Sequence, residues 1–417
     1  MHFIKIDSGN LGFKKYHYTL NATIKIYSLS IIKVLREKLS KMKFILKLTF
    51  LFLIAFSIEV KAQKLPSKKA ILSKMSLANA YFMQKWPDVA KPIWAADRTR
   101  PSNIWTRAVY YEGLLAMYQI KPEKAYLDYT VEWGEKHKWT LRNGVTTRNA
   151  DDQACAQAYL ELYLMNPKPE RIEAIKTNID NMLNSDKIDD WWWVDALQMA
   201  MPVYTRLAIL NKDNRYYEKM YQLYDFAKNH HGGKGLFNPQ DNLWWRDKDF
   251  VPPYTSPNGE DCYWSRGNGW VLAAMVRVLD IMPTDAPHRE EYLDMYQKMV
   301  KALVKVQRND GFWNVSLHDP NEFGGKELTG TALFTYGIAW GINKGILDKK
   351  MYSPIVSKAW LGMAEAVHTN GMLGYVQGTG KEPKDSQPVT FDTLPNFEDF
   401  GLGCFLLAGA EVYKLKK

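Results

Sequence analysis

The chain has 417 residues, of which 46% are hydrophobic and 13% aromatic, enough to bury a large core. Its formal net charge of +10 is concentrated at the start, because residues 1–62 hold 11 Lys and Arg against 3 Asp and Glu, which leaves 44 against 42 in the rest. A remainder so close to neutrality excludes a nucleic-acid-binding stripe and a polybasic membrane patch.

Residues 42–62 have the pattern of a signal peptide. A short basic region around Met42 precedes the apolar stretch 44–58, and small residues then stand before a cleavage site. The apolar stretch is too short to favour a membrane anchor, and no Cys follows the cleavage site as a lipoprotein would require. We expect Met42 to be the true start, with residues 1–41 an over-long reading frame or an unusual leader. The mature domain would then be 63–417, in the periplasm or secreted.

Helical periodicity runs through the mature chain. Apolar residues recur at i, i+3 and i+4 in twelve segments: 68–86, 104–119, 124–137, 150–165, 170–184, 191–210, 214–230, 270–281, 289–307, 330–344, 352–366 and 400–415. Mostly apolar segments and segments with one charged face both occur, which is what two concentric rings of helices need. The sequence therefore predicts an all-α fold, a single-domain (α/α)6 barrel.

Three long links, 232–264, 308–329 and 367–398, are rich in Gly, Pro, Asn and Asp. Long loops in compact proteins are more often functional than neutral, so we expect these loops to gather at one rim of the barrel. The three widely spaced cysteines of the mature chain describe neither a disulfide framework nor a zinc site, and they read as small buried hydrophobes. We expect no metal and no cofactor.

Asp195 is the most informative residue, because it lies in the run 191–201, which is apolar around its whole circumference. A buried carboxylate needs a partner or a function, and burial raises its pKa. Asp195 could instead cap its helix, but Asp189 and Asp190 stand just before the run and are better placed to cap. The tryptophans beside it suit either a sugar-binding pocket or plain core.

Two further segments suggest a binding site. Asp151 and Asp152 open the helix at 150, where acids are favoured by the helix dipole, or where one of them points into a central cavity. Arg266 stands in the segment 263–270, whose two glycines permit a left-handed turn before a helix, a natural anion site. Arg266 would grip a carboxylate with its guanidinium, or it pairs with an internal acid in a structural turn.

Other segments are weaker signals. The loop aromatics at 244–245 and 312–313 look exposed but could be rim packing, and Glu327 could be an N-cap followed by small residues for close packing. His230 and His231 end a helix, which favours capping over metal binding. The chain has no phosphate-binding loop, dinucleotide fingerprint, zinc-protease motif or serine elbow.

Six segments in order resemble the unsaturated uronyl hydrolases, most closely glycoside hydrolase family 105, which is related to family 88. They are "NADD" at 149–152, "WWWVDALQMAMP" at 191–202, "YWSRGNGW" at 263–270, "DGFW" at 310–313, "ELTGTALFTYGIAWGI" at 327–342 and "DFGLGCFLLAGAEVYKL" at 399–415. The resemblance covers about 68–415, nearly all of the mature chain.

The resemblance implies an (α/α)6 barrel without metal or organic cofactor, acting downstream of a polysaccharide lyase. The substrate would be an oligosaccharide whose non-reducing end is a uronate with a C4=C5 double bond. Asp195 matches the family's general acid/base, and Asp152, rather than Asp151, is our choice for the second carboxylate. The residues expected to hold the substrate are Arg266, Trp270, Asp151, Trp264, Trp244 and Trp192.

One departure concerns the substrate. Family members that act on pectin side chains often carry a His in the loop after a "GLF" segment, whereas Phe237 is followed here by residues 238–241 without a His. This places rhamnogalacturonan in doubt and favours a glucuronyl substrate from a sulfated algal polysaccharide such as ulvan. The alternatives are rhamnogalacturonyl hydrolysis, another (α/α)6 enzyme such as an epimerase or endo-glycosidase, and a non-catalytic glycan-binding protein. An epimerase would need paired buried His bases, and a binding protein would not need an isolated buried acid.

Overall fold

The computed structural model describes residues 64–95, 98–395 and 397–416, together with 36, 38–40 and 42–43. Residues Gln63–Lys417 form one compact unit. Of the predicted signal peptide, all but residues 42–43 lies outside the described residues. No helix in the described part of the chain is both long and apolar enough to cross a membrane.

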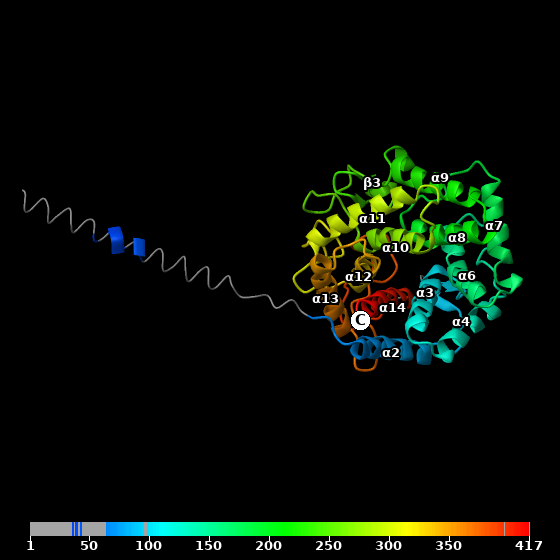
Figure 1. Ribbon diagram of the computed structural model, residues 1–417, viewed down its shortest axis with the longest axis horizontal. Coiled ribbons are helices and arrows are strands. Elements are labelled where there is room, and N and C mark those ends of the chain that lie inside the picture. Colours follow the sequence, from blue (N-terminus) through cyan, green and yellow to red (C-terminus); the bar gives the residue numbers. More distant parts are fainter. Residues whose placement is uncertain are drawn as a thin grey trace, which may run out of the picture. The chain divides into compact units, whose positions relative to one another are not determined.

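Helices of the compact unit form two concentric rings (Figure 1). The inner ring consists of α3 (Trp105–Ile120), α5 (Ala150–Gln153) with α6 (Cys155–Met165), α8 (Asp195–Asn211), α10 (Ser265–Ile281), α12 (Leu328–Asn343) and α14 (Asp399–Lys414). Each packs on the next, and α14 packs against α3 to close the ring. The outer ring consists of α2 (Lys68–Lys85), α4 (Lys124–Lys136), α7 (Glu173–Leu183), α9 (Arg215–Asn229), α11 (Arg289–Leu303) and α13 (Lys349–Glu365). Outer and inner helices alternate along the chain, so the predicted (α/α)6 barrel is confirmed.

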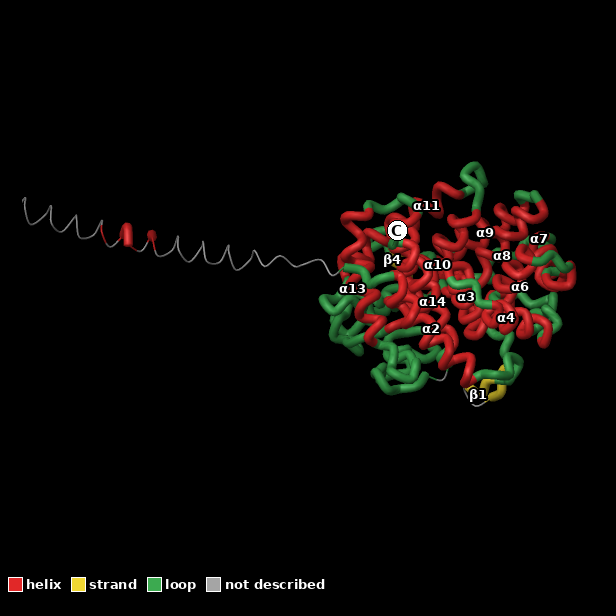
Figure 2. Tube along the Cα trace, turned by 60° about the horizontal axis from the view of Figure 1, so that its bottom comes forward, coloured by secondary structure: helices red, strands yellow, loops and turns green. Residues whose placement is uncertain are grey.

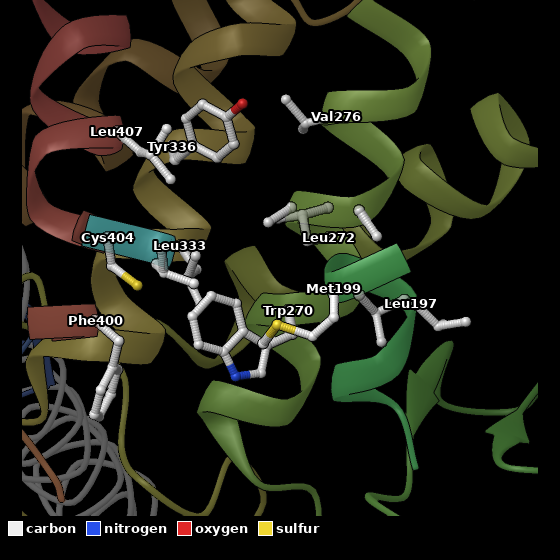
Figure 3. Close-up of a cluster of buried hydrophobic side chains, with 14 of the residues drawn as sticks. Leu197, Met199, Trp270, Leu272, Val276, Leu333, Tyr336, Phe400, Cys404 and Leu407 are labelled. Carbon is white, nitrogen blue, oxygen red and sulfur yellow. The ribbon is translucent and has the colours of Figure 1, made fainter. Parts of the chain in front are cut away.

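The ring that a helix occupies follows from its sequence. Nearly every side chain of α12 and α14 is buried, which requires helices without a charged face. Outer helices such as α9 and α11 bury one stripe and expose charges on the other face. Figure 3 shows the apolar centre, where Leu333, Trp270 and Met199 project from α12, α10 and α8 toward one another.

Short strands and 3-10 turns lie in the links. The hairpin of β1 (Ile93–Ala95) and β2 (Arg98–Arg100) is antiparallel, as is that of β3 (Phe237–Asn238) and β4 (Leu243–Trp244). The 3-10 turns are Pro169–Arg171, His231–Gly233, Lys248–Phe250 and Val304–Val306. Figure 2 shows β1 on the side of the barrel where long loops gather.

Three predicted helix limits are wrong. The helix expected from 191 begins at Asp195, because the residues just before it bond to a loop instead: Trp193 pairs with Asp247, and the Val194 N–H donates to the Arg246 carbonyl at 2.9 Å. The segment expected to be helical from 270 is already helical at Ser265, so no left-handed turn precedes it. The helix expected over 150–165 is interrupted at residue 154, between α5 and α6.

Candidate active site

A cavity of about 180 Å³ opens at the N-terminal ends of the inner helices. Its lining residues are Arg100, Ile104, Trp105, Asp151, Trp193, Asp195, Met199, Arg246, Trp264, Arg266, Trp270, Thr379, Gly380 and Phe397. Pockets that enclose a drug-sized ligand measure about 300–1,000 Å³, so this cavity suits a single sugar ring. The positive ends of the helix dipoles point toward it and favour an anionic ligand.

Two of the long loops, 232–264 and 367–398, supply part of this lining. All three predicted loops meet at this rim. Asn268 in α10 accepts from the Trp244 N–H at 2.8 Å and donates to the Trp244 carbonyl at 3.0 Å. Trp264 pairs with Ser316 of the second loop, and the Leu328 N–H donates to the Tyr375 carbonyl of the third. The prediction that the loops gather at one rim is therefore confirmed.

Asp195 is the first residue of α8, not a full turn inside it as predicted. It nevertheless does not cap the helix, since no side chain accepts a hydrogen bond at that N-terminus. Asp190 does not cap either, because it forms an ion pair with Arg148 at 2.5 Å. Asp195 lines the cavity, and its Oδ1 is buried without a hydrogen-bond partner.

Arg246 is the partner of Asp195, and the sequence reasoning missed it. The pairing of Trp193 with Asp247 brings the start of α8 beside this loop. The Arg246 Nε then donates to Asp195 Oδ2 at 3.1 Å, and its Nη1 donates to Asp247 Oδ2 at 2.6 Å. Asp195 thus has one oxygen held by a guanidinium and one buried oxygen without a hydrogen-bond partner. Proximity between residues 51 positions apart leaves no signal in a single sequence.

Asp151 and Asp152, one of which is expected to be the second carboxylate, have different surroundings. Asp152 is fully buried and accepts from Arg142 Nε at 2.5 Å, Asn143 Nδ2 at 2.8 Å and Thr147 Oγ1 at 2.6 Å. Asp151 lines the cavity with Asp195. Neighbouring residues of a helix point about 100° apart, so only one of the two acids can face inward. The structure therefore places Asp151 where we expected Asp152.

Both cavity carboxyls hold protons more tightly than usual. Burial, reinforced by the charge of Asp195, raises the pKa of Asp151 to about 7. Burial also raises the pKa of Asp195, although the positive charges of Arg246 and Arg266 oppose the rise. Because the two groups repel each other when both are ionised, they titrate as a pair that keeps a proton up to near neutral pH.

Arg266 lines the cavity, but its guanidinium is already engaged. Nη1 donates to the Gln377 carbonyl at 2.8 Å, and Nη2 donates to the Gly378 carbonyl at 2.7 Å. The group lies between the rings of Trp264, at 4.4 Å, and Phe400, at 4.9 Å. The predicted two-point grip on a substrate carboxylate is therefore not available in this conformation. Arg266 instead holds the loop that forms one wall of the cavity.

The predicted tryptophans divide into three groups. Trp264 and Trp270 line the cavity, and Trp264 Nε1 donates to Gln377 Oε1 at 3.0 Å. Trp244 does not line it, since its ring is fully buried between Tyr224 and Phe237. The other loop aromatics at 245 and 312–313 are buried too, so of the two interpretations of these segments rim packing holds.

Trp192, the remaining predicted tryptophan, is not part of the cavity lining. It is 47% exposed. Its neighbour Trp193 takes the lining position instead, because successive side chains of an extended segment point to opposite faces. The Trp192 ring lies 4.5 Å from that of Trp193 and 5.7 Å from the Arg246 guanidinium. Trp192 therefore borders the site through these two residues.

Comparison with known proteins identifies the family. The model of glycosyl hydrolase family 88 matches residues 75–416. The chain belongs to glycosyl hydrolase family 88. This family 88 chain is 32% identical, over 87% of its length and 96% of the relative, to an unsaturated 3S-rhamnoglycuronyl hydrolase of Formosa agariphila.

Solved structures agree with this assignment. A family 88 glycosyl hydrolase from Bacteroides vulgatus superposes with a TM-score of 0.75 and 31% identity, covering 84% of this chain and all of that one. A structure named as a polysaccharide lyase superposes with a TM-score of 0.74 and 30% identity, covering 83% of this chain and 97% of that one. The predicted resemblance is thus confirmed, and the chain is a glycosidase, an unsaturated uronyl hydrolase of the family 88 type.

Proposed function

We propose that this family 88 enzyme removes a 4,5-unsaturated glucuronate from the non-reducing end of an oligosaccharide by hydrating its C4=C5 double bond. The observation that carries the proposal is the Asp195 carboxyl in the lining of a cavity the size of one sugar, with Oδ2 held by Arg246 and Oδ1 buried without a hydrogen-bond partner. A cavity of that size favours an enzyme that acts on a terminal sugar. A carboxyl with a raised pKa favours a group that must first donate a proton.

Asp195 donates its proton to C4 of the vinyl ether, and the positive charge that develops is shared between C5 and the ring oxygen. Water adds to C5 and returns a proton to the carboxylate of Asp195, so the acid is regenerated. The product is a hemiketal at C5, whose ring opens and expels the rest of the oligosaccharide as a free alcohol. In the usual two-carboxylate glycosidase scheme the proton goes to the leaving oxygen instead.

Asp151 supports this step as the second carboxyl of the cavity, the role first expected of Asp152. Its own proton keeps the cavity from holding two negative charges beside Arg246. Asp151 also faces the cavity as a hydrogen-bonding group for sugar hydroxyls. Trp264, Trp270 and Trp193 supply flat apolar walls against which a sugar ring stacks.

We propose that the sugar next to the uronate is a sulfated rhamnose, as in the oligosaccharides that a lyase releases from ulvan. Two observations support this choice over rhamnogalacturonan. The relative from Formosa agariphila is named for a 3S-rhamnoglycuronyl substrate. The loop after Phe237 lacks the histidine that pectin-specific relatives often carry. The enzyme then acts after a polysaccharide lyase, which creates the double bond that it consumes.

One similar structure is named as a polysaccharide lyase, so the assay should also distinguish hydrolysis from lyase activity. Hydrolase and lyase activities change the ultraviolet absorbance of the C4=C5 bond in opposite directions. Purified protein is mixed with lyase digests and with intact polymers of ulvan, rhamnogalacturonan, alginate and glycosaminoglycans, and the ultraviolet absorbance of the C4=C5 bond is followed. The proposed hydrolase lowers this absorbance in the ulvan digest, whereas a lyase raises it in an intact polymer. Binding without either change would indicate a glycan-binding protein.

We also propose that the enzyme is exported, on the basis of the pattern in 42–62. Amino-terminal sequencing of protein recovered from the periplasm or medium should begin at or near Gln63. A mature protein that retains residues 1–41 would contradict the proposal.

A further inference from the structure

Two arginines beside the cavity form no ion pair with any acid that the structure describes. Arg100 lines the cavity, and its Nε is buried without a hydrogen-bond partner. Arg98, two residues earlier, is exposed. No ion pair is formed by either guanidinium within the described residues, whereas most buried or half-buried arginines of the barrel have one. An unpaired cation at the wall of a sugar cavity needs an explanation other than internal pairing.

The hairpin places both guanidinium groups on one face. In β1–β2, Arg100 lies opposite Ile93 and Arg98 lies opposite residue 95. Residues two apart on a strand share a face, about 7 Å from each other. That face carries the buried Ile93, so it is turned toward the body of the protein. Trp94 is on the other face and is 69% exposed.

The positive charges of Arg98, Arg100 and Arg142 repel one another. Burial lowers the pKa of Arg100, and the positive charges of Arg98 and Arg142 lower it further. Arg142 is neutralised by Asp152, and the negative charge of Asp151 offsets only part of the lowering of the Arg100 pKa. An oxyanion with several acceptor oxygens between the guanidinium groups would reduce the repulsion and satisfy the free Nε.

We propose that Arg98 and Arg100 form a subsite for a sulfate ester on the sugar next to the uronate. The proposal rests on the function proposed above. The cavity has room for the terminal uronate beside Asp195, so the next sugar must lie at its mouth. The pair spans this boundary, because Arg100 belongs to the cavity lining and Arg98 stands outside it. A group bound by both residues therefore belongs to the second sugar.

The test compares one disaccharide in two forms. The substrates are an unsaturated uronyl rhamnose with a 3-O-sulfate and the same disaccharide after chemical desulfation. Arg100→Gln should raise KM for the sulfated form by about 10–100-fold, the range expected for a lost charge-assisted hydrogen bond, and should raise KM for the desulfated form much less. Arg98→Gln should give a smaller rise, because an exposed guanidinium is better screened. Lys91→Gln, which removes a nearby exposed charge outside the cavity, is the matched control.

Direct binding separates this proposal from the proposed function. Methyl rhamnoside 3-sulfate should bind to the wild type in calorimetry and bind at least tenfold more weakly to Arg100→Gln. If that difference holds while the wild type consumes neither disaccharide, the sulfate subsite stands and the hydrolase function fails. Equal losses on both disaccharides would assign Arg100 to the uronate carboxylate, and no loss on either would remove it from substrate binding. Each of these two results overturns the proposal.

Discussion

The two ends of the barrel both bury carboxyl groups, yet they differ in what surrounds them. At the end opposite the sugar-sized cavity, burial raises the pKa of Glu112 to about 7, against the pull of Arg277. Asp151 has the same value at the cavity end. Glu112 Oε1 and Asp195 Oδ1 also both lack a hydrogen-bond partner. A raised pKa or an unpaired oxygen therefore does not by itself identify a catalytic acid.

The difference lies in the walls. Around Glu112, Arg277 donates to Glu161 at 2.9 Å and lies 3.6 Å from Glu112, and Arg206 donates to Glu161 at 3.1 Å. These groups fill the space and leave a cavity of about 70 Å³ with a mainly charged lining. Around Asp195 four tryptophans stand among the charged residues of the lining, and the cavity is about 180 Å³. Glu112 is consequently a matched control for each carboxyl of the proposed site.

The largest expected effect separates Asp195 from Glu112. Asp195→Asn keeps the shape of the side chain but removes the transferable proton, so kcat should fall by about 10²–10⁴-fold while the oligosaccharide still binds. Glu112→Gln should keep kcat within about threefold of wild type, because no substrate reaches it. Loss of the C4=C5 absorbance measures turnover, and calorimetry measures binding. If Asp195→Asn turns over within tenfold of wild type, the acid has been placed wrongly.

Asp152→Asn tests the position first expected to carry the second carboxylate. It leaves Arg142 without its buried charge partner, so the free energy of unfolding should fall by about 1.5–3 kcal/mol. Its kcat should stay well above that of Asp195→Asn. A loss in kcat as large as that of Asp195→Asn, in a variant that still folds, would restore Asp152 to the catalytic role.

Substitutions of Arg266 at the cavity end and of Arg277 at the opposite end should show which arginine affects substrate binding. Arg266→Lys cannot donate to the Gln377 and Gly378 carbonyls together, so we expect a loss of about 1.5–3 kcal/mol in unfolding free energy. Because these carbonyls hold a cavity wall, KM should rise as well. Arg277→Lys should destabilise comparably and leave KM unchanged. Wild-type stability in Arg266→Lys, with a raised KM, would return the guanidinium to direct substrate binding.

The pH dependence of activity should follow the carboxyl pair alone. Above a pH of about 7 the pair of Asp151 and Asp195 loses the proton that it holds, so kcat/KM should fall by up to tenfold per pH unit. Asp151→Asn should move this alkaline limb, because one of the two coupled groups is gone. Glu112→Gln should leave the limb in place, although the pKa of Glu112 is the same. An unchanged limb in Asp151→Asn would mean that another group sets it.

The free energy of unfolding should depend on pH through the buried carboxyls at both ends of the barrel. A carboxyl whose pKa rises from about 4 to about 7 on folding binds its proton more tightly in the folded state. Its destabilising contribution is therefore absent below pH 4, grows between pH 4 and 7 by at most about 1.4 kcal/mol per unit, and is complete above pH 7. Asp151→Asn and Glu112→Gln should each reduce this slope in chemical denaturation. A slope unchanged by either variant would contradict the raised pKa of that residue.

The same contrast explains what the sequence could predict. Helix periodicity predicts the rings because burial on one side or on all sides leaves a pattern in every helix. The sequence also predicts Asp195 as a site residue, because a carboxyl in an apolar run is recognisable from its immediate neighbours. It could not predict Arg246, whose contact depends on how a loop folds against the start of α8. It could not choose Asp151 over Asp152, because one residue of rotation decides which acid faces inward.

The smallest expected effect concerns Trp192, which was predicted to contact the substrate. The ring is 47% exposed and lies outside the cavity lining, so its removal in Trp192→Ala leaves no hole in the core. It does contact the Arg246 guanidinium, and a cation–π contact at an exposed site contributes about 0.5–1 kcal/mol. Since Arg246 orients Asp195, this loss should appear as a two- to fivefold fall in kcat, with KM for the disaccharide unchanged. A tenfold or larger rise in KM with kcat unchanged would show that the ring stacks on the sugar directly. Trp192 would then join Trp193, Trp264 and Trp270 as part of the binding surface, and the aromatic wall would extend beyond the cavity.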